Sequence, residues 1–199
     1  MKTILIGTTN QGKVNDFKQL LEKEGMQVLS LRDLDDAIEV EETGTTFAEN
    51  AILKAETLSR YYNQIVIADD SGLEIEALNG RPGVYSARYA GEHKSDEDNI
   101  KKVLAEMEGI PFQDRKAAFV CVLALAIPGK ETKIFEGKCH GYIAEIPKGN
   151  NGFGYDPIFY VPEKEKTMAE LSLEEKNELS HRKKALDKLK KYWDEHLQL

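Results

Sequence analysis

Short apolar runs alternate with amphipathic stretches along the first third of the chain. Residues 2–8 form an apolar run that predicts a buried strand, and the next segment predicts a helix, because Val14, Phe17, Leu20 and Leu21 fall on one face. The same reasoning predicts a second strand at 28–31, a helix over 46–61 and a third strand that leads to Asp69 and Asp70. Two early strand–helix units favour a mostly parallel or mixed sheet with helices on its faces.

The second half of the chain has a different pattern. A helix is predicted over 96–107. Two strands are predicted at 117–127 and 133–146, and Pro128-Gly129-Lys130 between them predicts a hairpin. A short strand at 158–161 and a helix from Leu173 to the terminus complete the pattern. We therefore expect one α/β domain over residues 1–199, with a mixed central sheet, flanking helices and two lobes around a central substrate cleft.

Composition narrows the functional classes. The 199 residues carry a formal net charge of −8, which disfavours general nucleic-acid binding. The lysines near the C-terminus alternate with Leu186, Leu189 and Trp193 at helical spacing, which is typical of the solvated face of a helix. The spacing of Cys121 and Cys139 suggests no zinc site, so we expect structural thiols in a reducing compartment. The sequence contains no signal peptide and no apolar run long enough to cross a bilayer, so we expect a cytoplasmic protein without membrane contact.

The run from Ile65 to Leu73 aims a strand at two adjacent carboxylates, Asp69 and Asp70, followed by Ser71 and Gly72. Neighbouring strand side chains point to opposite faces, so the two carboxylates cannot serve one ligand in the same way. One is expected to do chemistry and the other to brace the structure. The alternative is an ordinary Asp-Ser-Gly turn at the end of a buried strand.

The segment Thr8-Thr9-Asn10-Gln11-Gly12-Lys13 joins a predicted strand to a helix N-terminus. Free backbone N–H groups and the helix dipole favour an anion there, and Lys13 adds a full charge, so we predict a phosphate site. The spacing does not fit the Walker loop, which excludes a Walker-type hydrolase. The alternative is a capped turn with Asn10 as the N-cap and Lys13 in solvent.

Three acids, Glu39, Glu41 and Glu42, precede the next predicted helix. Magnesium takes one or two protein carboxylates and completes its shell with water and phosphate, so Glu41 with Asp70 is a candidate pair of ligands. The alternative is a solvated acidic loop. On the helix that follows, Lys54 is placed to reach a phosphate; the alternative is a surface ion pair with Glu49. Asn50 also falls inside this predicted helix, although asparagine has a low helix propensity.

A glycine-rich loop at 149–156 contains Phe153, Gly154, Tyr155 and Asp156, which suits stacking on a flat base and reading its edge. Such alternation of aromatic residues and glycines also builds ordinary tight loops. Further on, Lys176 precedes His181 and Arg182 at a predicted helix start, where the pair can contact a carbonyl or phosphate or simply form helix surface.

The order of these motifs resembles that of the non-canonical purine nucleoside triphosphate pyrophosphatases, also called inosine triphosphate pyrophosphatases, and the chain looks like a bacterial member. The resemblance covers essentially the whole chain. It rests on Thr8-x-Asn10-x-x-Lys13, Glu41-Glu42-Thr43-Gly44, Glu49-Asn50-Ala51 with Lys54, Ala68-Asp69-Asp70-Ser71-Gly72-Leu73, Gly80-x-Pro82-Gly83-x-Tyr85-Ser86-Ala87-Arg88, Gly152-Phe153-Gly154-Tyr155-Asp156-Pro157 and Ser180-His181-Arg182.

The resemblance implies a Mg²⁺-dependent homodimer that hydrolyses inosine, deoxyinosine and xanthosine triphosphates to the monophosphate and pyrophosphate. It implies that Asp70 is the general base and a metal ligand, Glu41 a second metal ligand and Ser71 a substrate contact. The triphosphate would be held by Thr8, Thr9, Asn10, Gln11, Gly12, Lys13 and Lys54. The base would be framed and read by Phe153, Gly154, Tyr155, Asp156, Lys176, His181 and Arg182.

Two other functions compete with this one. A Maf-type nucleotide pyrophosphatase is similar in fold but acts on pyrimidine or modified nucleotides, and the pair of His181 and Arg182 favours an oxo-purine instead. A nucleotide-sensing module without catalysis would use the same residues for binding. Asp70 and Glu41 argue against it, because binding alone gains nothing from a metal and a positioned base.

Overall fold

The computed structural model describes residues 3–22 and 26–197. Seven strands form one sheet in the order β2-β1-β3-β4-β5-β6-β7. β1 pairs in parallel with β2 and β3, whereas β6 pairs antiparallel with β5 and β7, so the sheet is mixed. The strands are β1 (Thr3–Ile6), β2 (Gln27–Ser30), β3 (Ile65–Ile75), β4 (Lys116–Ala126), β5 (Lys133–Ile143), β6 (Phe159–Val161) and β7 (Lys166–Thr167).

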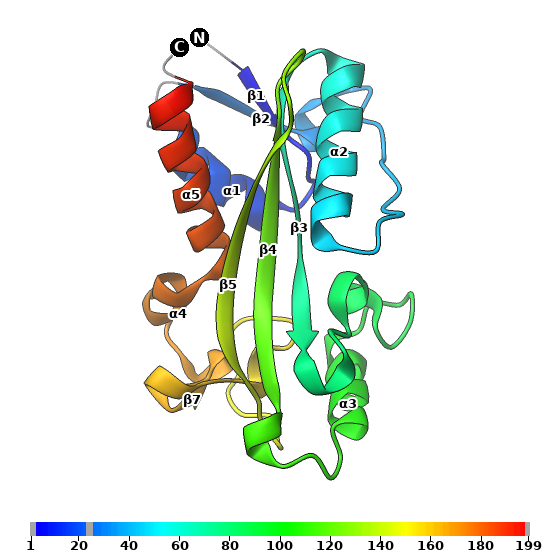
Figure 1. Ribbon diagram of the computed structural model, residues 1–199, viewed down its shortest axis with the longest axis vertical. Coiled ribbons are helices and arrows are strands. Elements are labelled where there is room, and N and C mark those ends of the chain that lie inside the picture. The colour runs from blue at the N-terminus through cyan, green and yellow to red at the C-terminus, as the bar shows by residue number, and fades with distance from the viewer. Residues whose placement is uncertain (1–2, 23–25, 198–199) are drawn as a thin grey trace. The chain divides into compact units, whose positions relative to one another are not determined.

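Helices flank the sheet, which confirms the predicted fold class (Figure 1). They are α1 (Gln11–Leu21), α2 (Phe47–Tyr62), α3 (Asp96–Glu106), α4 (Leu173–Leu179) and α5 (His181–His196). The chain divides into two compact units. Unit 1 contains residues 1–70, 121–136 and 184–199, and unit 2 contains residues 71–120 and 137–183.

The core of unit 1 forms on both faces of its strands. Phe17 of α1 and Leu189 of α5 pack with Ile4, Ile67 and Leu123 in one buried cluster. α2 covers the opposite face, where a Cβ on Gly7 would lie 2.8 Å from Leu58 Cδ1 and 3.1 Å from Ala68 Cβ. Figure 1 shows α1 and α5 on one side of β1 and α2 on the other. Both faces of these strands carry apolar side chains, and their burial determines which face each helix covers.

Local signals set the ends of the helices in unit 1. The side chain of Asn10 caps α1 by accepting from the Lys13 backbone N–H at 3.2 Å, as predicted. α2 begins with a reciprocal capping box between Thr46 and Glu49 and ends at Asn63, which adopts the left-handed conformation. These caps place Lys13 in the first turn of α1 and Asn50 in the first turns of α2.

The core of unit 2 gathers Leu73 and Ile75 of β3, Val103 of α3, and Ile143 and Phe159 from the later strands. Arg115 is buried beside this core, and its guanidinium donates to four backbone carbonyls, those of Met107, Ile110, Ile143 and Ala144. Its backbone carbonyl accepts from Ile143 N at 2.8 Å, which closes the end of the predicted β4–β5 hairpin. Desolvation lowers the pKa of Arg115 from its usual value.

Two sequence predictions are wrong in detail. β3 does not stop at Asp70 but continues to Ile75, so Ser71 and Gly72 are strand residues and form no turn. The C-terminal helix is broken at Ser180, whose ψ of 123° is not helical. The Ser180 side chain instead accepts from Lys183 N at 3.3 Å and starts α5.

Other differences are smaller. The two-residue strand β7 is not among the predicted strands, and the observed strand ends differ from the predicted ones by one to three residues, as in the hairpin strand predicted over 133–146 and observed as Lys133–Ile143. Lys2, the last two residues and the side chain of Leu20 lie outside the described residues. Both cysteines are buried, Cys121 in the core of unit 1 and Cys139 in that of unit 2. Among the described residues, every helix is too short or too polar to cross a bilayer.

Candidate active site

Asp69 and Asp70 stand in the middle of β3, at the point where its neighbour β1 ends. β1 pairs with β3 from Ile4 opposite Ile65 to Ile6 opposite Ile67, and the last backbone hydrogen bond runs from Gly7 N to Ile67 O at 2.8 Å. The carboxylates therefore lie just beyond the carboxyl end of β1 instead of that of β3. The sequence predicts these carboxylates at the end of their own strand. They lie instead in the middle of β3, beside the carboxyl end of the neighbouring strand β1.

The two carboxylates meet different helices, as strand alternation predicts. Asp69 is 1% exposed, and its Oδ2 lies 2.6 Å from Nζ of Lys13 on α1. Its backbone carbonyl accepts from Nζ of Lys54 on α2 at 2.6 Å, and the same ammonium forms an ion pair with Glu42. Two cations from opposite sides of the sheet thus meet at one residue of β3.

Asp70 is also buried and faces α2, where its Oδ2 accepts from Asn50 Nδ2 at 3.0 Å. The other end of the same amide accepts from Gly44 N at 2.7 Å. A Cβ on Gly44 would lie 2.6 Å from Asn50 Oδ1, so the loop approaches the amide as closely as only glycine allows. Asn50 therefore joins the end of the acidic loop to the Asp70 carboxylate. The sequence predicts Asn50 in a helix interior, whereas the structure places it in the first turn of α2.

The predicted phosphate loop connects β1 to α1 in unit 1. Thr8 Oγ1 accepts from Asn10 N at 3.2 Å, and Asn10 caps the helix, so the loop is held by short side-chain contacts. The side chains of Thr9 and Gln11 are exposed, and that of Gln11 donates to Asn15 at 3.0 Å. The backbone N–H groups at the start of α1 and the Lys13 ammonium thus lie on one short segment, which is a suitable cradle for an anion.

The carboxylates of Asp70 and of the acidic loop before α2 are oxygen ligands of the kind that hard divalent cations prefer. Glu41 is exposed and Glu42 half-buried in the loop that ends at Gly44, and both candidate ligands, Glu41 and Asp70, are carboxylates. Within residues 3–22 and 26–197 there is no cluster of three or more His, Cys, Asp or Glu side chains that would form a complete cage. Carboxylate oxygens suit magnesium better than zinc, which prefers nitrogen and sulfur ligands.

Unit 2 holds the second group of predicted residues. The Asp156 carboxylate is 5% exposed; its Oδ2 accepts from Phe153 N at 3.0 Å and forms an ion pair with Lys176 of α4. Lys176 Nζ also lies 4.9 Å from the centre of the Phe153 ring. A Cβ on Gly152 would lie 2.0 Å from Asp156 Oδ2, and the φ of Gly152 is +80°, so this turn requires glycine.

Phe153 is 73% exposed, although it follows a well-fixed turn. An exposed aromatic ring with a cation beside it is suited to stack on a flat base. Its neighbour Tyr155 differs, because its ring is buried and its hydroxyl donates to Ser86 O at 2.6 Å. Gly154 N donates to Asp96 Oδ2 at 2.7 Å, which ties the loop to the start of α3.

The last predicted residues begin α5. His181 and Arg182 are half-buried, and the His181 ring stacks on Phe119 of β4 with 5.4 Å between ring centres. Phe119 stacks in turn on Phe159, at 4.3 Å. The break at Ser180 places this pair at a helix start, as predicted. Ser71 is half-buried on β3, directly after Asp70.

A model of the Ham1 family matches residues 4–192, almost the whole chain. The chain belongs to the Ham1 family. It is 60% identical over 195 residues to a dITP/XTP pyrophosphatase of Geobacillus kaustophilus, covering 98% of this chain and 96% of the relative. It is 59% identical over 191 residues to the dITP/XTP pyrophosphatase of Bacillus subtilis, covering 96% of each chain. The predicted family is confirmed.

Solved structures agree with this assignment. The Ham1 protein of Staphylococcus aureus superposes with a TM-score of 0.92 at 52% identity, covering 98% of this chain and 99% of that one. A dITP/XTP pyrophosphatase of Mycobacterium abscessus gives 0.84 at 43% identity, covering 94% and 97%. The predicted enzyme class, the nucleoside-triphosphate pyrophosphatases, is thereby confirmed together with the fold.

Proposed function

We propose that this Ham1-family protein hydrolyses dITP, ITP and XTP to the monophosphate and pyrophosphate in a Mg²⁺-dependent reaction, and so clears these nucleotides from the cellular pool. The names of the relatives support the substrates dITP and XTP. The observation that carries the chemistry is that Lys13 and Lys54 both contact Asp69, the residue directly before Asp70 on β3 in unit 1. Such a group supplies both the base and the cations that phosphate-anhydride cleavage requires.

Asp70 is the proposed general base and a magnesium ligand, with Glu41 as the second ligand. When bound, Mg²⁺ supplies charge neutralisation on the phosphates and geometric order. Asp70 accepts a proton from the water whose oxygen attacks the α-phosphorus; the new bond from oxygen to the α-phosphorus replaces the bond to the bridging oxygen, and pyrophosphate leaves. Thr8, Thr9, Asn10, Gln11, Gly12, Lys13 and Lys54 hold the triphosphate, and Ser71 contacts the substrate.

Asn50 supports this role of Asp70. Its amide occupies one oxygen of the carboxylate at 3.0 Å and thereby orients the group. A carboxylate whose rotation is restricted by a neutral donor remains an anion that can face water or a metal. The contact from Gly44 to the same amide orients the loop with Glu41 and Glu42 in the same way.

Base selection is assigned to unit 2. Phe153 offers the exposed ring, the fixed pair of Asp156 and Lys176 lies beside it, and His181 and Arg182 supply donors for a 6-oxo group. Gly154 and Tyr155 complete the loop that frames the base. A site built for an oxo group leaves polar atoms unsatisfied when a 6-amino group is presented, which rejects the wrong base strongly.

The deciding experiment measures pyrophosphate release from dITP, ITP, XTP, ATP, GTP, UTP and CTP, first with Mg²⁺ and then with a chelator. We expect fast, Mg²⁺-dependent release from the first three alone. Preference for pyrimidine nucleotides would instead indicate Maf-type activity, and binding of nucleotide without release from any would indicate a sensing module. Sedimentation analysis of the same sample tests the proposed homodimer, and fractionation of producing cells tests the proposed cytoplasmic location.

A further inference from the structure

Ser86 is a buried residue of the 3-10 helix at Gly83–Arg88 in unit 2, and its contacts reach two segments of the proposed site. Its hydroxyl accepts from Leu73 N at 2.8 Å and donates to Gly83 O at 2.6 Å. Both hydrogen-bonding functions of the hydroxyl are thus used, one of them on β3, three residues after Asp70. The hydroxyl fixes the strand backbone at the segment that carries Ser71.

Gly72 shows how tightly this segment is held. A Cβ at this position would lie 2.4 Å from Ser86 Oγ and 2.8 Å from Gly83 O. The strand can come so close to Ser86 only because residue 72 lacks a side chain. Gly72 and Ser86 therefore form a fitted pair, and the path of β3 after Asp70 depends on both.

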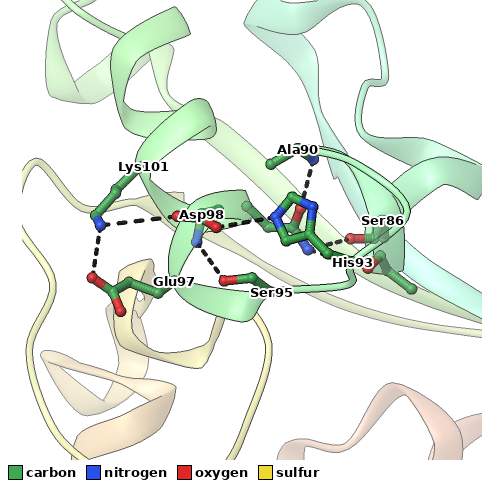
Figure 2. A network of polar contacts seen from close by, with 9 residues as sticks. Ser86, Ala90, His93, Ser95, Glu97, Asp98 and Lys101 are labelled. Atoms are coloured by element: carbon green, nitrogen blue, oxygen red, sulfur yellow. Dashed lines mark hydrogen bonds and ion pairs between the residues drawn. The ribbon is translucent and has the colours of Figure 1, made fainter.

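The backbone carbonyl of Ser86 makes the second connection. It accepts from the Tyr155 hydroxyl at 2.6 Å and from Asn99 Nδ2 at 3.4 Å. The Asn99 side chain also accepts from Ala90 N at 2.7 Å, so the 3-10 helix is clamped to the start of α3 (Figure 2). Tyr155 in turn lies in the loop between Phe153 and Asp156. One residue thus connects the proposed base loop with β3.

The surroundings of Tyr155 suit a structural donor. Burial raises the pKa of its hydroxyl well above the usual value, so the group stays protonated throughout the pH range in which enzymes work. Its ring is 5% exposed, in contrast to the 73% of Phe153. A base would stack on the exposed ring and leave the buried one in place.

We propose that Tyr155 and Ser86 are a positioning pair that holds the Ser71–Leu73 segment in register with the base loop, and that Tyr155 does not read the base. This rests on the proposed function, and it changes the role of one residue within it. Loss of the Tyr155 hydroxyl would loosen the segment after Asp70 and slow turnover equally for every substrate. Loss of a base contact would instead change the ratio between substrates.

The test compares Tyr155→Phe and Ser86→Ala with the unaltered protein. We expect kcat to fall by about tenfold in each, with KM changed less than about twofold, because misplacement of reacting groups costs rate more than affinity. The ratio of kcat/KM for dITP to that for dATP stays unchanged. The double variant is no slower than the slower single variant, since both act through one connection. Tyr160→Phe, the same change on β6, is the control and keeps normal kinetics.

Hydrogen exchange makes the test independent of activity. We expect amides in the peptide Ser71–Ile75 to exchange faster by about tenfold in Tyr155→Phe, while those of α5 keep their rates, because opening is local. Unchanged exchange at Ser71–Ile75 overturns the proposal, whatever the enzyme hydrolyses. A shift in the dITP to dATP ratio also overturns it, because Tyr155 would then read the base. Absence of hydrolysis by the unaltered protein would refute the proposed function alone.

Discussion

The two groups of candidate residues are built by different physics. In unit 1, charged side chains from separate segments form ion pairs, Lys13 with Asp69 and Lys54 with Glu42. In unit 2, Asp156 pairs with Lys176, and the other hydrogen bonds described for the base loop each have a backbone group at one end, as from Phe153 N to Asp156 and from Tyr155 to Ser86 O. Ion pairs can exchange partners when a charged ligand arrives, whereas bonds to backbone fix the shape of a loop.

This contrast suggests a division of labour. A triphosphate carries several negative charges, and ammonium groups held by carboxylates are available for it without a change of fold. A base is flat and neutral and is recognised by shape and by a few hydrogen bonds, so its site must be rigid beforehand. We therefore expect substitutions of the charged residues of unit 1 to affect all nucleotides equally, and substitution of Asp156 or its partner Lys176 to change selection.

The largest expected effect is that of Asp70→Asn. The change removes the proposed base and one metal ligand but preserves shape and the contact from Asn50, so turnover should fall by roughly a thousandfold or more. Folding should be retained, because an amide of equal size replaces the carboxylate. Pyrophosphate release with each nucleotide measures the first effect and thermal unfolding the second. Near-normal turnover would refute the assigned role and remove the chemical basis of the contrast.

A pair of lysine substitutions tests the division directly. Lys54→Met removes an ammonium that contacts Asp69 O and Glu42, and should lower kcat/KM by roughly a hundredfold for every nucleotide. Lys176→Met should change the ratio between dITP and dATP instead. It also leaves Asp156, 5% exposed, without its ion pair and should cost roughly 1–3 kcal/mol of unfolding free energy, less than for a fully buried pair because Lys176 is 25% exposed. Equal behaviour of the two variants would contradict the contrast.

A third test replaces one glycine by alanine in each unit, at a position where neighbouring atoms come close to the glycine backbone. Gly72→Ala places a Cβ 2.8 Å from Gly83 O in unit 2, and Gly44→Ala places one 2.7 Å from Glu49 Cβ in unit 1. Each should cost about 1–3 kcal/mol, measured by urea unfolding, because atoms on both sides must move. Ser86→Ala should not relieve the strain in Gly72→Ala, since the Gly83 carbonyl remains in contact. Full relief would show that the hydroxyl alone determines the fit.

The sequence predicts the elements well where the apolar period is clear. α2 and α3 were expected over 46–61 and 96–107 and are observed over Phe47–Tyr62 and Asp96–Glu106. The end of β3 was misplaced because Asp-Ser-Gly is typical of turns, and the chain gives no local sign that Ser86 pairs with Leu73 from thirteen residues away. The break at Ser180 is a similar case, since the helical period continues through it and only the serine signals a cap.

The same limit applies to the site. Asp70, Lys13 and Lys54 are predicted from their residue types, but the ion pair between Lys13 and Asp69 depends on the alternation of β3 and on the approach of α1. Asn50 is visible in the sequence as an oddity, whereas its partners Gly44 and Asp70 are known only from the fold. Single residues can be identified from the sequence, and the contacts that orient them cannot.

The smallest expected effect concerns the cap of α2, the helix that carries Asn50 and Lys54. Hydrogen bonds from the backbone N–H and the hydroxyl of Thr45, and from Thr46, lower the pKa of Glu49 below its usual value. The ionised carboxylate therefore stabilises the fold above the unfolded-state pKa, and this contribution is lost as the pH falls through the lower, folded-state pKa. In Glu49→Gln, the free energy of unfolding should therefore fall less steeply as the pH is lowered, measured by urea unfolding between about pH 3 and pH 6.

Glu174→Gln is the matched control, because it removes the same charge from the first turn of α4 outside the capping box. In Glu174→Gln, the free energy of unfolding should decrease with falling pH as steeply as in the unaltered protein. If kcat at neutral pH also falls modestly in Glu49→Gln but not in Glu174→Gln, the cap contributes to placing Asn50 and Lys54. The rigid part of unit 1 would then be the start of α2, and the ion pairs around Asp69 its adaptable part. An unchanged kcat would instead show that Asn50 is fixed by Gly44 and Asp70 alone.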